Sequence, residues 1–150
     1  GGASGFGQVV GSLEMYGDIN FKPGAELKFN GVVFSPTAGT YTPTLDNTTN
    51  VASSSVLGPF TFSRIGDIVT VAGGVSIDPT TTGSTVLGIT LPIASNFADA
   101  FNASGTAGAS TPNTVGSIAS DATNDRVTVT FIAVDTASRN WRLVFMYPVM

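Results

Sequence analysis

Turn-forming residues recur about every eight to twelve positions along this chain and separate short segments rich in Val, Ile, Thr, Phe and Tyr. No segment has apolar residues repeating every three to four positions over a helical length. Chains with this spacing form antiparallel sheets that pack as sandwiches or barrels. At 150 residues the chain is long enough for one such domain with one core. The sequence therefore predicts an all-β fold, and we expect a jelly-roll-like antiparallel β-sandwich.

The clearest hairpin joins residues 60–65 to residues 68–77 through a Gly-Asp turn. Gly66, at the first loop position, supplies the positive φ that a two-residue turn needs. Gly73 and Gly74 interrupt the second strand, which indicates either a β-bulge or a close backbone approach. We expect further strands at residues 86–91, 103–109, 115–120, 126–134 and 141–149, and a short helical turn at residues 93–101.

Both faces of the last expected strand are apolar. One face carries Trp141, Leu143, Phe145, Tyr147 and Val149, and the other carries Val144 and Met146. A strand that is apolar on both sides lies either within one core or between its own core and another subunit. Because the rest of the chain carries few charges, we favour the subunit contact. The candidate interface residues are Val144, Met146 and Pro148.

The chain has few charged residues, only 11% of the sequence, and its net charge is −4. Such a surface gives separate copies little electrostatic protection against association, which favours a permanent oligomer. The Lys and Arg residues form no basic stripe, so we expect no nucleic-acid partner. The longest apolar runs are strand-sized, well short of the ~20 residues of a spanning helix, so we expect no membrane insertion.

Neither cysteine nor histidine occurs, which removes the usual transition-metal ligands, the usual general base and the usual nucleophile partner. We therefore expect no enzymatic activity, no catalytic residue and no cofactor. Asp121 and Asp125 flank a turn where two carboxylates suit a calcium ion. The alternative is that these residues hydrogen-bond to the backbone and shape the turn. We favour the second reading and expect no metal, because no glycine or terminal Glu completes a calcium loop.

The first 36 residues differ in composition from the rest. The segment from 1 to 11 is rich in glycine, and the segment from 13 to 34 alternates short apolar pairs with turns. The strands expected in this segment have about three to five residues, which is too short for a stable unit on its own. We therefore divide the chain into an extended N-terminal arm of short strands, residues 1–36, and a β-sandwich head domain, residues 37–150. The candidate anchor residues of the arm are Phe6, Val9, Leu13, Tyr16, Phe21 and Phe29.

Two polar segments of the head domain are candidate contact surfaces. Residues 46–55 are expected to form a long exposed loop, and residues 135–141 join the last two strands. A Trp side chain can stack on a sugar ring while Arg and Asn bind its hydroxyls. The alternative for Trp141 is that it begins the buried face of the last strand. The candidate receptor or glycan contacts are Asp46, Asn47, Asn50, Arg139, Asn140 and Trp141.

Several motifs occur here in a fixed order: GTYTPTL at residues 39–45, FSRIGDIVTV at 62–71, LPIASNF at 91–97 and DATNDR at 121–126. With the closing aromatic strand, they resemble a family of bacteriophage virion proteins of the tail-fibre head or decoration type. Phe62 stands where the hairpin pattern of that family has Tyr. Segments 19–24 and 27–31 also resemble the repeats that lead into phage fibre heads.

The resemblance implies a homotrimer on the virion surface whose other partners are coat or tail proteins. In the fibre role, the head domain projects outward as a spike tip and binds a host surface glycan or protein. In the alternative role, a capsid decoration protein clamps coat subunits through its N-terminal arm. We favour the fibre role because of the repeats that precede residue 36. A further alternative is a secreted carbohydrate-binding module, which is expected to be monomeric and tied to an enzyme.

Overall fold

Twelve β-strands are the regular elements in the described part of the chain. The computed structural model describes residues 27–29, 32–34, 37–110 and 113–150. No helix among these residues is long and apolar enough to cross a membrane. The strands are β1 Leu27–Phe29, β2 Val32–Phe34, β3 Thr37–Tyr41, β4 Leu45–Thr49, β5 Val51–Val56, β6 Phe60–Ile65, β7 Ile68–Pro79, β8 Gly83–Thr90, β9 Ser104–Ser110, β10 Asn113–Asp121, β11 Arg126–Ala133 and β12 Arg139–Pro148.

The strand order is that of a rolled antiparallel ribbon. β7 pairs with β12, β8 pairs with β11, and β9 pairs with β10. Rolling this ribbon brings β9 beside β12, which is the arrangement of a jelly roll. β6, β5 and β3 extend one side of the sheet, and β4 extends the other. The all-β antiparallel fold predicted from the sequence is confirmed.

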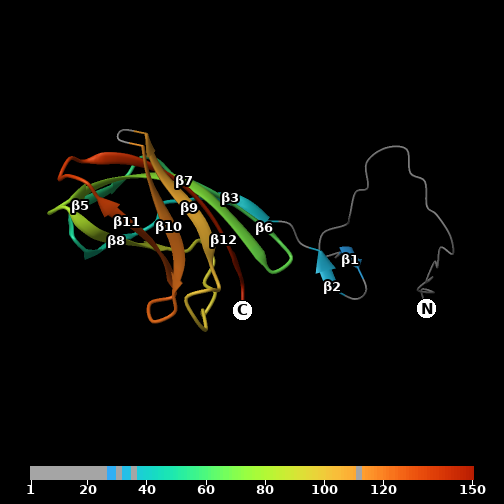
Figure 1. Cartoon of the computed structure of the whole chain (residues 1–150). Helices are drawn as coiled ribbons and strands as arrows, with labels where there is room; N and C mark the ends of the chain where they lie inside the picture. Colours follow the sequence, from blue (N-terminus) through green and yellow to red (C-terminus); the bar gives the residue numbers. More distant parts are fainter. Residues whose placement is uncertain (1–26, 30–31, 35–36, 111–112) are drawn as a thin grey trace, which may run out of the picture.

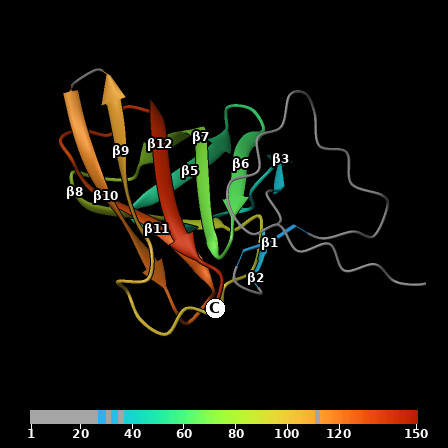
Figure 2. The ribbon, with the colours of Figure 1, turned by 90° about the vertical axis from the view of Figure 1, so that its right-hand side faces the viewer.

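The ten strands of the head domain form one curled sheet whose two halves face each other (Figure 1). Seen from the side, β9, β12, β7 and β6 lie next to one another in one layer (Figure 2). The sheet continues through β10, β11, β8 and β4 to make the second layer. The β-sandwich is therefore a single sheet folded over its own core, whose largest fully buried side chains are Trp141, Tyr147, Phe60, Phe145, Ile77, Leu87 and Ile89.

The side chains of β12 alternate between core and surface as the sequence predicts. Trp141, Leu143, Phe145 and Tyr147 are buried, and the ring centroids of Trp141 and Phe131 lie 4.1 Å apart. On the opposite face, Val144 and Met146 are 45% and 51% exposed. One face of the terminal strand is thus covered by the core of its own chain, while the other face is open.

A short β1–β2 hairpin precedes the head domain and forms its own two-stranded sheet. Its strands have three residues each, as expected for the arm. Of the candidate anchor residues, Phe29 belongs to β1, and its side chain lies outside the described residues. The other five also lie outside the described residues: Phe6, Val9, Leu13, Tyr16 and Phe21.

Gly73 provides space for the ring of Phe60 inside the core. A Cβ atom at Gly73 would lie within 2.5 Å of three Phe60 ring carbons. The register between β7 and β12 runs without interruption through Gly73 and Gly74. Of the two predicted explanations for the paired glycines, a β-bulge between β7 and β12 is therefore wrong, and the close neighbour at Gly73 is the side chain of Phe60 rather than another backbone segment.

The segment 46–55, expected as a loop, forms most of strands β4 and β5 instead. Asn50 makes the turn with a φ of 54°, a conformation that Asn tolerates. β4 pairs with β8 and β5 pairs with β7, so both strands lie at edges of the sheet. The loop expectation is wrong because strands with exposed Ser, Thr and Asn on both faces show no alternating apolar pattern.

Residues 91–103, where a short helical turn was expected, form an irregular loop without a helix. The carboxylate of Asp125 accepts hydrogen bonds from the backbone N–H groups of Ser95, Asn96 and Phe97 at 3.1, 2.7 and 3.3 Å. The amide oxygen of Asn102 accepts two more N–H groups, from Ala98 and Asp99. Side-chain acceptors therefore replace helical hydrogen bonds along this loop.

Removing the Asp125 carboxylate is expected to destabilise the head domain by about 2–4 kcal/mol, because three backbone donors lose a charged acceptor. Glycine is the suitable replacement, since Asp125 has a φ of 47° and alanine would add backbone strain. Urea unfolding of Asp125→Gly measures the effect. Asp125→Asn keeps one acceptor oxygen and should lose less than half as much, so equal losses in both variants would contradict this role.

The C-terminus is tied to the loop 91–103. The Tyr147 hydroxyl donates to the carbonyl of Ile93 at 2.8 Å, and the Ser95 hydroxyl donates to the carbonyl of Pro148 at 2.5 Å. The N–H of Met150 donates to the carbonyl of Ser95. Burial raises the pKa of Tyr147 to about 12, so the phenol keeps the proton that it donates.

The head domain has two distinct ends. At the entry end, β3 starts beside β6, with Thr37 opposite Arg64, and the C-terminus meets the Gly66–Asp67 turn and the loop 91–103. The far end carries the Asn50 turn, the turn between β7 and β8, the last residues of β9, the first residues of β10 and the loop before β12. The chain from the arm therefore reaches the head domain opposite the far end.

Candidate functional site

Two rows of uncharged residues cross the outside of five adjacent strands, β7, β12, β9, β10 and β11. The strand registers place them side by side. We call these ten residues the uncharged face: Ala72, Val144, Thr106, Ser117 and Thr130 in one row, and Thr70, Met146, Ser104, Ala119 and Thr128 in the other. Val144 and Met146, two of the three candidate interface residues, lie on β12, the second of these five strands, and Pro148 follows at the entry end, opposite Ile68.

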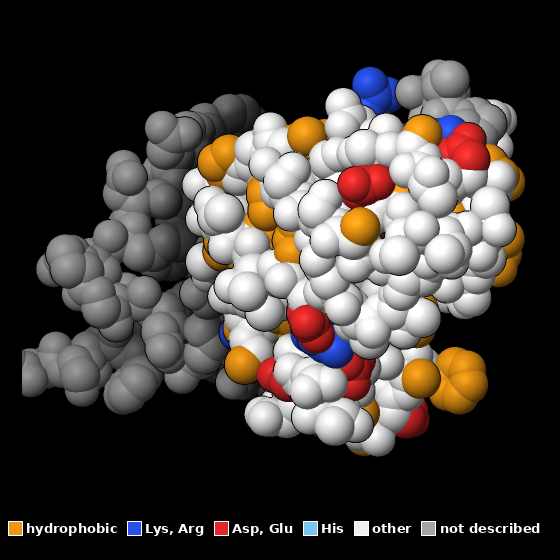
Figure 3. Space-filling model, turned by 90° about the vertical axis from the view of Figure 1, so that its left-hand side faces the viewer, with side chains coloured by type: hydrophobic (Ala, Val, Ile, Leu, Met, Phe, Trp, Pro, Cys, Tyr) orange, Lys and Arg blue, Asp and Glu red, His pale blue; other side chains and the backbone are white. Residues whose placement is uncertain are grey.

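Charged side chains of the head domain are few and mostly gathered into pairs. A space-filling view of one side shows a mainly uncharged surface, on which some of the red and blue atoms lie next to each other in small clusters (Figure 3). The ion pairs join Arg64 to Asp67, Arg126 to Asp46 and Asp121, and Arg139 to Asp135. Most charges are therefore neutralised locally rather than spread over the sheet.

The candidate contacts on the first polar segment are held in structural interactions. Asp46 pairs with Arg126 near the entry end. The side chain of Asn50 donates to the carbonyl of Thr81 at 2.8 Å and accepts from the N–H of the same residue at 2.8 Å. Asn47 accepts a hydrogen bond from Ser54 at 2.6 Å. Asp46 and Asn50 thus lie toward opposite ends of the domain and form no common surface.

Of the candidate contacts on the second segment, Trp141 is buried and Arg139 is paired. Trp141 is only 1% exposed, so it offers no ring face to a sugar, and the alternative of a buried residue is the correct one. The guanidinium of Arg139 binds both carboxylate oxygens of Asp135 at 2.6 Å. Asn140 is exposed on the outer side of β12. Of this group, Asn140 alone presents an exposed side chain on the sheet.

Hydrogen bonds from Arg139 and from the N–H of Ala137 lower the pKa of Asp135 to about 2. The ion pair therefore persists fully above pH about 4 and is lost as the pH falls through about 2. Carboxyl-carbon NMR should give a titration midpoint near 2. In Arg139→Gln the midpoint should move up toward the ordinary value of 3.8, whereas Arg142→Gln should leave it unchanged; an unshifted midpoint in Arg139→Gln would contradict the pairing.

Asp121 and Asp125, the pair considered for calcium, are used to build turns and loops. Burial acts to raise the pKa of Asp121, but hydrogen bonds from Asn124 and Arg126 lower it below its usual value. The carboxylate of Asp125 binds the loop 91–103 as described above. Among the described residues, no group of three or more acidic side chains gathers as a metal site. The hydrogen bonds of these two residues match the turn-building alternative.

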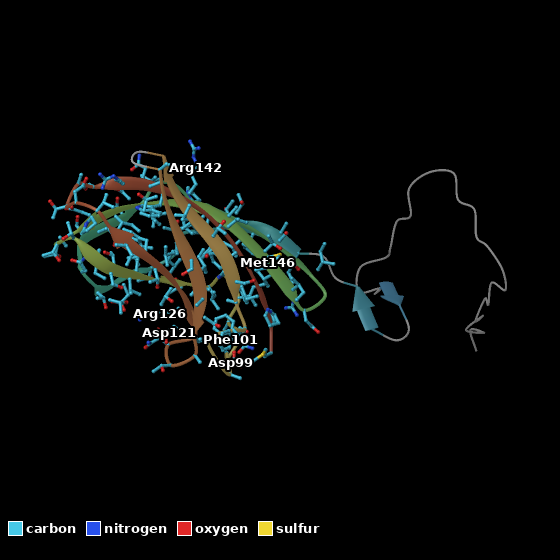
Figure 4. All side chains as sticks on the ribbon, viewed as in Figure 1. Asp99, Phe101, Asp121, Arg126, Arg142 and Met146 are labelled. Atoms are coloured by element: carbon cyan, nitrogen blue, oxygen red, sulfur yellow. The ribbon has the colours of Figure 1, made fainter. Side chains whose placement is uncertain are left out.

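Arg126 forms ion pairs with two carboxylates at the entry end of the second layer. Its Nε donates to Asp121 at 2.8 Å, and its terminal nitrogen pairs with Asp46. The guanidinium lies directly over Gly88 of β8, where an added Cβ would come within 2.7 Å of it. This bridge joins β11 to the edge strand β4 across β8, and its role is structural. Figure 4 shows Arg126 and Asp121 at the same end as Asp99 and Phe101.

Arg142 is the exception among the described arginines. No ion pair or hydrogen bond reaches its side chain within the part of the chain that the structure describes. The β12 registers place it between Gly74 of β7 and Gly108 of β9. Figure 4 shows its side chain projecting from the outer side of the sheet, away from the end with Asp99 and Phe101.

Comparison with known proteins gives no relative. No family model, curated protein or solved structure matches this chain.

Sequence reasoning missed the hollow around Arg142, which is lined by Leu57, Gly73, Gly74, Gly108, Ala109, Asn113, Asn140, Trp141 and Arg142. The lining residues come from five separate stretches of the chain. The register of three neighbouring strands brings the two glycines to either side of the arginine, and no local motif signals that register.

Proposed function

We propose that this chain is a structural protein of a bacteriophage virion, displayed outward as a homotrimer whose far end contacts the host surface. The observation that carries the proposal is the uncharged face. Ten side chains without charge cover five strands, and the two largest apolar ones, Val144 and Met146 on β12, are about half exposed. A surface without charges gives separate copies little electrostatic protection against association, which favours a permanent oligomer. The motifs that resemble phage virion proteins supply the virion context.

The exposed side chains at the entry end suit attachment of the head domain to the rest of the particle. Four of its large apolar side chains are exposed: Ile65, Ile68, Phe101 and Met150. Phe101 is 92% exposed, yet its loop is fixed by side-chain hydrogen bonds. Exposed apolar groups on a fixed backbone suit docking against another protein. The arm reaches the head domain at this end, so docking here would leave the far end outward.

This arrangement suits a fibre tip, and it also suits the alternative of a capsid decoration protein that clamps coat subunits through its arm. A secreted carbohydrate-binding module is the further alternative. These three roles differ in what the chain binds and in its assembly. The fibre tip binds host cells, the decoration protein binds coat shells, and the module is monomeric and absent from the particle.

The proposal is tested with purified residues 1–150, susceptible host cells, and virions or coat shells stripped of this chain. Binding to cells with reduced phage adsorption is expected. Binding to shells alone, lost on deleting residues 1–36, would favour the decoration role over the fibre tip. Absence of the chain from purified virions, measured by mass spectrometry, would overturn the proposal.

A further inference from the structure

The base of the hollow around Arg142, which we call its floor, is formed by strand backbone without neighbouring side chains. Gly74 and Gly108 lie directly beside Arg142 in the sheet, so neither neighbouring strand places a side chain next to the guanidinium. A Cβ at Gly108 would meet no heavy atom within 4 Å, which shows how open this side is. The backbone of three strands is therefore accessible from outside the sheet at this row.

The walls of the hollow combine one apolar side chain with two amides. Leu57 is about half exposed, and its N–H donates to the carbonyl of Gly74 at 2.9 Å, which fixes it at one side. Asn140 precedes Arg142 on the outer side of β12, and Asn113 begins β10. All line the same hollow. Hydrogen-bond donors and acceptors thus surround the floor, with an apolar surface at one edge.

The charge of Arg142 is available to a ligand. The other described arginines each pair with a carboxylate, and Arg142 does not. A guanidinium offers five donors in a planar fork that matches a carboxylate in two parallel hydrogen bonds. The net charge of the chain is −4, so a general attraction for anions is not expected. Any preference for an anionic ligand must come from this site.

We propose that the hollow binds a sugar residue that carries a carboxylate, in glycans of the uronic or sialic acid type. The carboxylate pairs with Arg142, the ring lies on the glycine floor against Leu57, and Asn113 and Asn140 bind its hydroxyls. The inference rests on the proposed function, because it assigns a ligand class to the displayed head domain. The position fits this role, since Arg142 lies in the half of β12 nearer the far end and Met146 in the half nearer the entry end.

The test is a titration of the full ¹⁵N-labelled chain with trigalacturonate and with sialyllactose, observed at the Arg142 Nε–H and the amide side chains of Asn113 and Asn140. At least one acidic sugar should shift these signals. Its uncharged counterpart, methyl-esterified trigalacturonate or lactose, should bind about tenfold more weakly or worse. Arg142→Gln should lose about the same factor. Arg139→Gln is the matched control, because that guanidinium is already paired, and it should bind like the natural chain.

A second variant separates the shape of the hollow from its charge. Gly108→Val places a side chain beside Arg142 without altering the guanidinium, and a β-branched residue is well suited to a strand. It should leave stability unchanged and still reduce binding about tenfold. Unaltered binding in Gly108→Val, or equal affinity for inorganic phosphate, would show that charge alone attracts anions and would overturn the proposal.

The remaining outcomes are also decisive. No shift with either acidic sugar at millimolar concentration would overturn the inference. A change in the assembly mass of Arg142→Gln would mean that the arginine pairs with a carboxylate of another copy, which would overturn it too. If the chain binds acidic sugar but is absent from virions, the site stands and the virion proposal fails. If it is present in virions but binds no sugar, only the inference fails.

Discussion

Gly73→Ala should destabilise the head domain by about 3 kcal/mol or more, near or above the upper end of the usual cost of overpacking a core. The added Cβ would lie within 2.5 Å of three ring carbons of Phe60, a fully buried residue. Tyr41 packs edge-on against the same ring at a centroid distance of 5.7 Å, so the ring has little room to move. Urea or thermal unfolding of the variant measures the loss.

Gly58→Ala is the matched control for this substitution. A Cβ at Gly58 meets no heavy atom within 4 Å, and its φ lies outside the left-handed region. Its stability should therefore stay within about 0.5 kcal/mol of the natural chain. A second control uses Phe60→Ala, in which the clashing ring is gone and Gly73→Ala should cost far less. A cost of less than about 1 kcal/mol for Gly73→Ala in the natural background would contradict the close-packing explanation.

Phe145→Asp should abolish the folded state. Phe145 is buried between its neighbours on the inner face of β12, and no cation in the core is available to pair with an introduced carboxylate among the described residues. A carboxyl group without a partner in an apolar core costs several kcal/mol even when it is protonated, and the loss of the buried ring costs about 3–5 kcal/mol more. Together these costs approach or exceed the roughly 5–15 kcal/mol that stabilises a typical domain. Circular dichroism should show no cooperative unfolding transition.

Phe145→Leu keeps an apolar side chain at the same position and should cost about 1–3 kcal/mol while preserving the transition. The neighbouring substitution Met146→Asp places the same charge on the opposite, exposed face and should leave the domain folded. A folded Phe145→Asp with native stability would mean that the inner and outer faces of β12 are assigned the wrong way round.

The sequence predicts the fold best where apolar alternation and turn chemistry agree. The β6–β7 hairpin is correctly bounded at its turn because Gly66 supplies a positive φ of 59° between two strands of alternating burial. β11 and β12 are predicted for the same reason, since each has one strongly apolar face. β4 and β5 are missed because both are edge strands whose Ser, Thr and Asn side chains resemble those of a loop.

Functional surfaces are less predictable because they depend on which strands become neighbours. Asp46 and Arg126 are 80 positions apart in the sequence, yet they pair across β8. Arg139, chosen as a contact for its charge, is neutralised by Asp135 four positions earlier, a pairing that its own loop could have suggested. Arg142 stands out only once the registers of β7 and β9 reveal a glycine on each side. Long-range register, rather than local composition, determines this site.

The central claim is that copies of this chain meet through the uncharged face, and sedimentation equilibrium of residues 1–150 tests it most directly. The natural chain should have three times the mass of the 15.3 kDa monomer. Met146→Asp should sediment as a folded monomer, because the introduced charge would be left unpaired within the contact. Thr82→Asp, which adds the same charge in the exposed turn between β7 and β8, should remain trimeric. A monomeric natural chain, or a Met146→Asp variant that stays trimeric, would contradict the claim.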